Sequence, residues 1–337
     1  MEQRQFGKSG LRLSILSLGA MTMGESEGFM KGVGSDEAEA LWVLDASLDA
    51  GIDTIDTANV YSEGRSEELV GAWMKGKRQR ITLLTKCRFP TVPGMHPNEY
   101  GLSRKSVIWN CEESLRRLQT DVIDLYQVHM QDRTAPIDET LRALDDLQRA
   151  GKIRYAGCSN YTGYRLTESL WSADRHDTVR FDGIQLQWSL VSREAERELI
   201  PASRAFGLGV LAWSPLASGF LTGKYQRGEQ PPEGSRLAAW KDGWAGRATE
   251  QNWRTLDAVQ AVAKRRESTA AVVSLAWLLQ RPEVTSVIVG ARTTSQLAEN
   301  LKASALKLTP EEIAGLDKAS APDWGYPYSM ISGREPW

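Results

Sequence analysis

Eight short apolar runs, each followed by a candidate helix, constrain the fold of this 337-residue chain more than any other feature. Near-continuous apolar strands that alternate with helices are typical of a parallel sheet covered by helices. Eight such units favour closure into a barrel over an open, doubly wound sheet. The predicted strands are residues 15–20, 52–56, 81–86, 122–129, 153–159, 181–188, 207–215 and 284–290. We therefore predict a (β/α)8, or TIM, barrel that forms a single domain over residues 1–337.

Two segments fall outside this alternation. Residues 4–14 contain two glycines suited to a turn and resemble a β-hairpin placed before the barrel. Residues 217–249 form a long loop after the seventh strand, rich in Gly and Pro, that carries Trp240 and Trp244. Long loops in compact domains are usually functional or disordered. Because this one leaves the carboxyl end of a strand, we expect either a lid over a flat ligand or a loop that its tryptophans fix to the barrel.

Composition excludes several classes of partner and location. The formal net charge of −2 gives no electrostatic reason to expect nucleic acid or an anionic membrane as partner. No apolar run approaches the ~20 residues of a membrane span, and the N-terminus lacks the apolar core of a signal peptide. The three cysteines, Cys87, Cys111 and Cys158, lack C-x-x-C spacing and are expected to be small apolar filler. We predict a cytoplasmic protein without a metal site.

Four polar residues lie at or just past the carboxyl ends of three successive predicted strands. Asp56 and Tyr61 follow the second strand, Lys86 ends the third, and His129 ends the fourth. In a (β/α)8 barrel these strand ends meet at one mouth, where catalysis takes place. One carboxylate, one phenol, one amine and one imidazole together could deliver a proton to an oxygen atom.

The chemistry of the four residues is compatible with reduction of a carbonyl group. A tyrosine is a poor acid at neutral pH, with a reference pKa of about 10, and the ammonium of Lys86 would lower the Tyr61 pKa. Asp56 would hold Lys86 charged, and His129 would share the substrate oxygen or relay the proton. No side chain can donate hydride, so a reduction implies a nicotinamide cofactor. Taken singly, each residue also has a structural explanation, such as an ion pair or a buried imidazole.

The usual dinucleotide-binding fingerprint is absent, because no G-x-G-x-x-G follows a predicted strand. A nicotinamide enzyme with this sequence must therefore bind its cofactor across barrel loops. Residues 288–303 could provide one anchor, since Thr293 or Thr294 begins a helix there. Arg292 precedes this cap, where free backbone N–H groups favour an anion. An amphipathic surface helix would explain the leucines of this segment without a ligand.

Several motifs together resemble the aldo-keto reductases. They are GIDTIDTANVYSEGRSEELVG, LLTK, IDLYQVH, GKIRYAGCSN, IQLQWS, WSPLASGFLTGKY and VGARTTSQLAENL, in this order along the chain. The resemblance covers residues 4–318 and is to a bacterial branch that is also similar to the potassium-channel β-subunits. It implies a (β/α)8 barrel and reversible, NADPH-dependent reduction of an aldehyde or ketone. The family's catalytic Asp, Tyr, Lys and His fall on Asp56, Tyr61, Lys86 and His129.

The resemblance also implies a set of cofactor contacts. Those to the nicotinamide carboxamide fall on Ser159, Asn160 and Gln187, with Asp56 close by and Trp213 stacking on the ring where a Tyr is common. Those near the pyrophosphate fall on Ser214, Pro215, Leu216, Ser218, Gly219, Leu221 and Lys224, with Arg236 crossing over the cofactor. Those at the adenosine end fall on Gly290, Arg292, Gln296, Glu299 and Asn300, and Gly19 and Met21 approach from the first loop. Because Gly290-Ala291 replaces the Lys-Ser of some branches, selectivity for NADP would rest on Arg292 and Gln296.

Two other functions are compatible with parts of the sequence. The chain could be a cofactor-sensing regulatory subunit, although its four catalytic positions are intact. It could also be a Schiff-base lyase using Lys86, although Tyr61 beside a charged lysine argues against this. Substrate specificity is expected in residues 22–34, 87–101 and 217–249 and the tail at 321–337. Apolar or aromatic candidates to line the pocket are Met23, Phe29, Met30, Phe89, Trp240, Trp244 and Tyr326, and the oligomeric state stays open.

Overall fold

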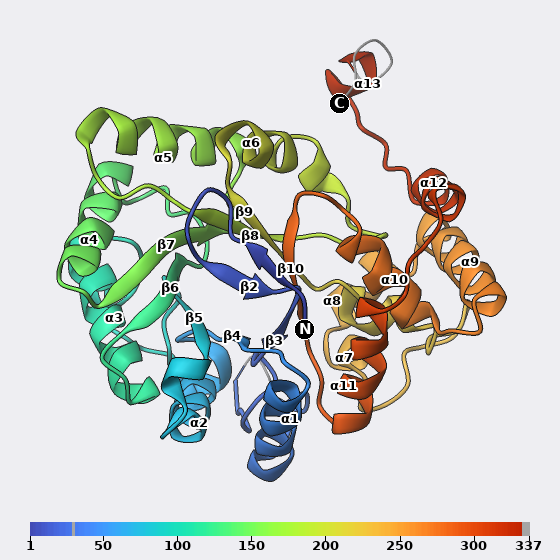
Figure 1. The fold of residues 1–337 in the computed structure, drawn as a ribbon, viewed down its shortest axis with the longest axis horizontal. Coiled ribbons are helices and arrows are strands. Elements are labelled where there is room, and N and C mark those ends of the chain that lie inside the picture. Colours follow the sequence, from blue (N-terminus) through green and yellow to red (C-terminus); the bar gives the residue numbers. More distant parts are fainter. Residues whose placement is uncertain (29–30, 332–337) are drawn as a thin grey trace.

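Eight parallel strands close into a barrel in the computed structural model, which describes residues 1–28 and 31–331 and only the backbone of 241 and 242. The barrel strands pair in chain order, and the last pairs with the first to close the sheet (Figure 1). They are β3 (Leu16–Gly19), β4 (Thr54–Asp56), β5 (Thr82–Cys87), β6 (Ile123–Val128), β7 (Ile153–Ser159), β8 (Gly183–Gln187), β9 (Gly209–Trp213) and β10 (Val284–Val289). The predicted (β/α)8 barrel is confirmed: seven observed strands lie within the predicted ones, and β5 extends one residue beyond its predicted end.

Helices surround the barrel on its outer face (Figure 1). The longer ones are α1 (Glu37–Asp49), α2 (Arg65–Met74), α3 (Arg104–Leu118), α4 (Ile137–Arg149), α5 (Gly163–His176), α6 (Leu199–Phe206), α9 (Glu250–Arg265), α10 (Ala270–Leu279), α11 (Thr294–Leu301) and α12 (Pro310–Ala319). The short helix α13 (Tyr328–Ile331) stands apart from the barrel in Figure 1.

Short polar side chains cap most of these helices, whereas α2, α4 and α6 begin without a side-chain cap. Thr293, one of the two predicted candidates, caps α11 by accepting a hydrogen bond from the Gln296 backbone N–H. The cap of α1 is Asp36, and the hydroxyl of the preceding Ser35 donates to the Thr22 carbonyl.

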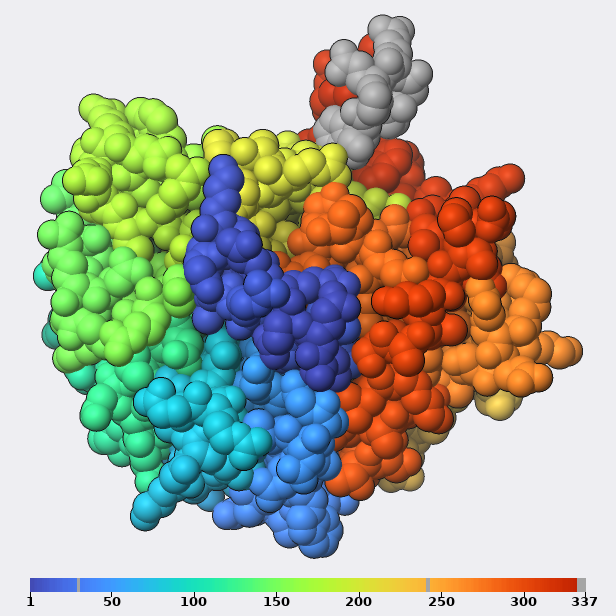
Figure 2. All heavy atoms as spheres, viewed as in Figure 1, coloured from blue at the N-terminus to red at the C-terminus, as the bar shows by residue number. Residues whose placement is uncertain are grey.

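An antiparallel hairpin of β1 (Gln3–Gln5) and β2 (Arg12–Ser14) lies across the amino ends of the strands, as predicted for residues 4–14 (Figures 1 and 2). Its Phe6 side chain is fully buried. A Cβ at Gly183 or Gly209 would lie 2.2 or 2.1 Å from the Phe6 ring, so only glycine leaves room for it. The hairpin thus closes one end of the barrel, and a ligand has to enter from the carboxyl ends of the strands.

The barrel interior has an apolar layer and a polar layer. The apolar layer next to the hairpin comprises Phe6, Leu13, Leu84, Leu125, Leu211 and Ile288. Side chains two residues apart on a strand point to the same face. Lys86 and Gln127 therefore lie above Leu84 and Leu125, toward the mouth. This two-residue spacing brings polar groups together on top of an apolar floor.

The segment after β9 is not the structureless loop that its composition suggested. It contains the 3-10 turn η5 (Ala217–Thr222) and the helices α7 (Arg236–Ala239) and α8 (Lys241–Arg247). Trp244 packs against Tyr225 and Trp253, with ring centroids 5.4 and 6.2 Å away. This aromatic packing fixes α8 to the body of the protein. It agrees with the expectation that tryptophans fix the segment to the barrel.

Candidate active site

A buried ion pair lies at the centre of the mouth. Lys86 Nζ donates to Asp56 Oδ2 at 2.6 Å and to the Thr57 carbonyl at 2.9 Å. Lys86 is 0% and Asp56 3% exposed, so neither charge is solvated by water. Burial by itself lowers the pKa of Lys86, but the Asp56 charge and Tyr61 outweigh it and hold the pKa above its ordinary value. Lys86 therefore stays an ammonium at neutral pH.

Two glutamines complete the surroundings of Asp56. Gln185 Nε2 donates to Asp56 Oδ1 at 2.8 Å, and Gln127 Nε2 donates to the same oxygen at 3.4 Å. A buried ion pair is stable only when such additional hydrogen bonds satisfy its remaining lone pairs. Neither glutamine was predicted from the sequence. Their spacing could have identified them, because Gln127 precedes His129 by two residues and Gln185 precedes Gln187 by two, which places each pair on the same strand face.

Tyr61 begins the short 3-10 turn η1 (Tyr61–Gly64) and meets the ion pair with its hydroxyl. Lys86 Nζ donates to the Tyr61 oxygen at 3.2 Å. Burial raises the pKa of Tyr61, the Lys86 charge opposes this, and the net pKa is above its ordinary value. The expected net lowering is therefore wrong for the protein alone. The physical reason is that burial dominates and that Asp56 offsets much of the Lys86 charge.

His129 follows β6 directly and faces Tyr61. Their ring centroids are 5.7 Å apart in an edge-on arrangement, and the Phe89 ring lies 5.0 Å from the imidazole. Burial, assisted by the charges of Lys86 and Arg88, lowers the pKa of His129 well below its ordinary value, so the ring is neutral. Its Nδ1 is buried and has no hydrogen-bond partner within the described part of the chain. The structure thus brings all four predicted residues together.

Two of the residues expected at the nicotinamide, Asn160 and Ser159, lie beside His129. Asn160, in a left-handed conformation with φ 53°, donates its amide to the His129 carbonyl at 2.8 Å and to Ser159 Oγ at 3.1 Å. Gln187 and Trp213 pair at the adjoining ends of β8 and β9. The Trp213 indole N–H is buried and lacks an acceptor among the described residues. These amide and indole groups leave hydrogen-bonding capacity for a ligand.

Two positions of the first loop lie nearby. Gly19 ends β3 beside Asp56, and a Cβ there would lie 2.9 Å from Ile288. Met21 is half-buried in the loop that follows.

A cluster of three cations lies further along the mouth. The pKa of Lys224 is lowered by partial loss of water and by the charges of Arg292 and Arg236. The pKa of Arg236 is lowered by burial and by Arg292, and its charge also reaches Tyr61. Within residues 1–28 and 31–331 none of the three forms an ion pair with a carboxylate. Mutually repelling, unneutralised cations are suited to phosphate groups.

The turn after β9 leads into this cluster with an unusual backbone. Ser214, Ala217 and Ser218 have φ of 55°, 49° and 58°, and Gly219 follows at 88°. Non-glycine residues in this region cost of order 1–3 kcal/mol each and concentrate at ligand sites. Half-buried Leu216 and buried Pro215 belong to the same turn. Leu221 is buried in the core, so it can meet a ligand only through its backbone.

The expected adenosine end lies at the start of α11. Gln296 Oε1 accepts from the Arg292 backbone N–H at 2.9 Å, which orients the entry to the helix. Asn300 is buried and donates to the Gly290 carbonyl at 3.4 Å. The Glu299 carboxylate accepts hydrogen bonds from Thr269 and Lys302 at 2.6 Å each. Glu299 is therefore already engaged within the protein.

The candidates to line a substrate pocket divide into three groups. Phe89 contacts His129, and Trp240 lies 5.5 Å from the Arg236 guanidinium, so both are at the mouth. Met23 belongs to the core, Trp244 packs against the core, and Tyr326 is 83% exposed, so none of the three is placed to line a pocket. Phe29 and Met30 lie outside the described residues.

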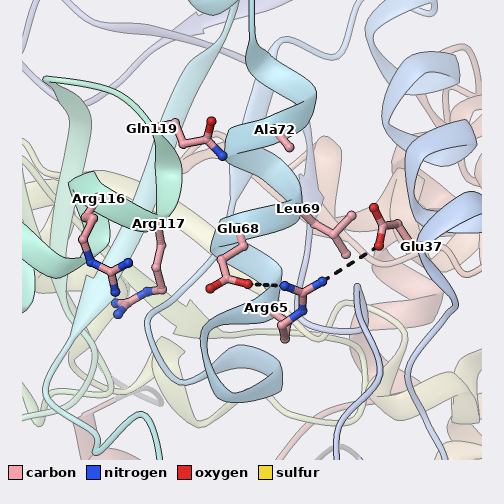
Figure 3. A pocket seen from close by; sticks show the side chains of 8 residues that line it. All are labelled: Glu37, Arg65, Glu68, Leu69, Ala72, Arg116, Arg117 and Gln119. Atoms are coloured by element: carbon pink, nitrogen blue, oxygen red, sulfur yellow. Dashed lines mark hydrogen bonds and ion pairs between the residues drawn. The ribbon is translucent and has the colours of Figure 1, made fainter.

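A separate hollow lies on the outer surface at α1, α2 and α3 (Figure 3). Its volume is about 320 Å³, and its lining residues are Glu37, Arg65, Glu68, Leu69, Ala72, Arg116, Arg117 and Gln119. Arg65 pairs with Glu68 and Glu37, as Figure 3 shows. The other two arginines pair with Glu113 and Glu67. Its arginine charges are thus neutralised, unlike those of the cation cluster at the mouth.

Other kinds of site find little support in the described residues. All three cysteines are buried and free, as expected, and burial raises the pKa of Cys87 to about 12, so this thiol stays protonated. Between residues 1–28 and 31–331, no group of three or more His, Cys, Asp or Glu is placed to hold a metal ion. In the same part of the chain, the helices are too short or too polar to cross a membrane.

The fold is a (β/α)8 barrel, and comparison with known proteins shows that the chain is an oxidoreductase. The model of the aldo/keto reductase family matches residues 15–321, and the chain belongs to that family. It is 38% identical to an uncharacterized oxidoreductase, YrpG, of Bacillus subtilis, over 92% of this chain and 93% of that protein. It is 36% identical to a probable voltage-gated potassium channel subunit beta of Oryza sativa, over 93% and 94%. It is 33% identical to versiconal hemiacetal acetate reductase of Aspergillus parasiticus, over 96% and 98%.

Proposed function

We propose that this protein reduces an aldehyde or ketone to an alcohol, reversibly, with NADPH as the reductant. The observation that carries the proposal is the chain of contacts from Asp56 through Lys86 to the Tyr61 hydroxyl, which ends beside a neutral His129. A carbonyl oxygen placed between the phenol and the imidazole would receive two hydrogen bonds. Such polarisation stabilises the charge that develops on the oxygen during reduction.

In this proposal Tyr61 is the general acid. Its hydroxyl donates the proton to the carbonyl oxygen, and the Lys86 ammonium stabilises the phenolate that remains. Lys86 keeps its own protons, because Asp56 holds it charged. His129 enters as a neutral hydrogen-bonding group, since its pKa lies well below the ordinary value. The bound nicotinamide would supply the hydride.

The residues at the mouth fit a nicotinamide dinucleotide. Asn160, Gln187 and Ser159 offer amide and hydroxyl groups for the carboxamide, and the wide indole of Trp213 could stack on the ring. The unneutralised Lys224, Arg236 and Arg292 would hold the phosphates. Three cations exceed what the two phosphates of a pyrophosphate require, which supports NADPH over NADH.

A second candidate is a cofactor-sensing regulatory subunit without significant turnover. Its support is the similarity to relatives named as probable potassium channel subunits beta. This alternative predicts tight NADPH binding with no consumption of NADPH in the presence of carbonyl compounds.

The decisive experiment measures the loss of NADPH absorbance with a panel of aldehydes and ketones. We expect turnover with NADPH, and a fall of ~10²–10⁴-fold in Tyr61→Phe, the typical loss when general acid catalysis is removed. NADPH affinity, measured by fluorescence quenching, should stay nearly unchanged in this variant. The control is Tyr164→Phe, which removes a hydroxyl from a side chain that is 62% exposed on α5.

Two results would oppose the proposal. Near-full turnover in Tyr61→Phe would exclude the phenol as the acid. Binding of NADPH without consumption across the panel would favour the regulatory alternative.

A further inference from the structure

Arg88 stands at the mouth in a backbone conformation that side chains disfavour. It directly follows β5, two residues after Lys86, and its φ is 130°. Two hydrogen bonds maintain this conformation. The Gly101 N–H donates to the Arg88 carbonyl at 2.8 Å, and Asn59 Nδ2 donates to the carbonyl of the next residue, Phe89, at 2.9 Å. Backbone strain that the surroundings maintain in this way concentrates at functional sites.

The Arg88 guanidinium lies next to the proposed reaction centre. Its central carbon is 4.7 Å from the centroid of the Phe89 ring, and that ring lies 5.0 Å from the His129 ring. The Phe89 ring thus contacts both the guanidinium and the imidazole. The positive charge of Arg88 also helps to lower the pKa of His129, after burial and Lys86, which agrees with the short distance.

No carboxylate of the described residues pairs with this guanidinium, which contacts the Phe89 ring. Throughout residues 1–28 and 31–331 its side chain makes neither a hydrogen bond nor an ion pair. Its Nε is buried, whereas the terminal nitrogens keep contact with solvent. The other cation of the centre, Lys86, is paired with Asp56. An arginine that is partly removed from water and lacks a counter-charge gains from binding an anion.

The carboxylate of Asp132 is near Arg88 but is occupied by other donors. Its Oδ2 accepts from the Leu102 N–H at 3.0 Å, and its Oδ1 accepts from the backbone and hydroxyl of Thr134 at 2.9 and 2.6 Å. Burial opposes the lowering of the Asp132 pKa, and the hydrogen bonds from Thr134 and Leu102 cause most of that lowering. The Arg88 charge makes a smaller contribution in the same direction as the hydrogen bonds. Asp132 therefore does not neutralise the guanidinium by direct contact.

We propose that Arg88 binds a carboxylate on the substrate, so that the site prefers carbonyl compounds that carry a negative charge several bonds away from the reacting carbon. The planar fork of an arginine matches a carboxylate in geometry. The cofactor phosphates have their own cations in Lys224, Arg236 and Arg292, so the anion at Arg88 belongs to the substrate. This inference rests on the proposed carbonyl reduction and names the substrate class for it.

The test compares two aldehydes of similar shape that differ in charge, 4-carboxybenzaldehyde and methyl 4-formylbenzoate. In Arg88→Met, kcat/KM for the acid should fall about tenfold to hundredfold, the range for a lost charge-assisted hydrogen bond, mainly through KM. The ester should be nearly unaffected. Arg88→Lys should retain part of the preference, because it keeps the charge. The control is Arg133→Met, which removes an exposed arginine from the loop after β6.

Several outcomes would overturn the proposal. If kcat/KM in Arg88→Met falls equally for the acid and the ester, Arg88 only supports the loop. If kcat/KM falls for neither, Arg88 does not bind an anion of the substrate. A second pair of substrates, glyceraldehyde 3-phosphate and glyceraldehyde, tests whether Arg88 binds a phosphate instead. If the Arg88-dependent preference for the phosphate exceeds that for the carboxylate, the anion bound at Arg88 is a phosphate and the carboxylate proposal is wrong.

Failure of the inference and failure of the proposed function can be told apart by binding measurements. If none of these aldehydes is reduced, the proposed reduction fails. Binding of 4-(hydroxymethyl)benzoate and of its methyl ester, followed by tryptophan fluorescence, then still tests Arg88. Weaker binding of the acid alone in Arg88→Met supports the inference, and equal binding in wild type and variant refutes it.

Discussion

Replacement of Arg292 by alanine tests how the protein distinguishes NADPH from NADH. The two cofactors differ by one phosphate on the adenosine ribose. Arg292 precedes the Thr293 cap of α11, where the helix N-terminus also favours an anion. Its guanidinium belongs to the cation cluster with Lys224 and Arg236. A charge-assisted hydrogen bond contributes roughly 1.5–3 kcal/mol, or about tenfold to hundredfold in affinity. We expect Arg292→Ala to raise the Kd for NADPH by that factor and to leave NADH nearly unchanged.

A second contact of Arg292 makes the ratio of the two affinities the useful quantity. Its Nη1 donates to the Gly234 carbonyl at 3.4 Å and so connects the start of α11 to the segment 217–249. Loss of this long hydrogen bond would weaken both cofactors alike. The ratio of the NADPH and NADH dissociation constants cancels that contribution and isolates the phosphate.

The assay is quenching of tryptophan fluorescence by NADPH and NADH, repeated with 2′,5′-ADP and AMP to remove the nicotinamide half. Lys307→Ala is the control, because Lys307 is an exposed lysine between α11 and α12. Equal weakening of both cofactors in Arg292→Ala would mean that Arg292 only shapes the loop. If neither affinity changes, the phosphate lies elsewhere, and Arg236 and Lys224 are the next residues to replace.

Three further predictions concern proton transfer and stability. Lys86→Met removes the charge that opposes the raised pKa of Tyr61. The residual reduction should therefore persist to higher pH than in wild type, once circular dichroism has shown that the variant is folded. An unchanged pH profile would contradict the electrostatic coupling of Lys86 to Tyr61. Burial raises the pKa of Asp182 to about 6, so its ionisation costs the folded state stability as pH rises from about 4 to 6, and the cost persists above that range. Asp182→Asn keeps the hydrogen bond from the Ala156 N–H. In urea unfolding this variant should be more stable than wild type by about 1–3 kcal/mol at pH 7.5 and equally stable at pH 4. The same stabilisation at both pH values would refute this reasoning. Phe6→Ala should lower the free energy of unfolding by about 3–5 kcal/mol, since it empties the floor of the barrel, and a loss below about 1 kcal/mol would show that the hairpin does not seal it.

Much of the architecture follows from local patterns in the sequence. Each barrel strand is an apolar run bounded by polar residues, and such runs need no distant partner to be identified. The position of a polar residue at the end of a run then predicts which end of the barrel it occupies. Asp56, Lys86 and His129 could be assigned to one mouth for this reason, and the structure brings them together with Tyr61.

Other properties depend on residues that are distant in the sequence. The pKa of Tyr61 is raised because burial and Asp56 outweigh the nearby ammonium, and spacing along the chain gives no measure of burial. The glutamines that hold Asp56 come from β6 and β8, 71 and 129 residues away. Residues 217–249 look structureless from their Gly- and Pro-rich composition, and one of the aromatic partners of Trp244, Trp253, lies outside the segment.

The same distinction separates the chemistry of the site from its selectivity. The residue types at the strand ends, which the sequence shows directly, determine that a proton donor, a cation and an imidazole meet at the mouth. Whether a cation is free to bind an anion depends on every carboxylate around it. Lys86 and Arg88 are two residues apart in the sequence, yet only Lys86 is neutralised by an ion pair within the described chain. Charge compensation is a property of the folded surroundings, so only the tertiary structure could show that, among the described residues, Arg88 forms no ion pair.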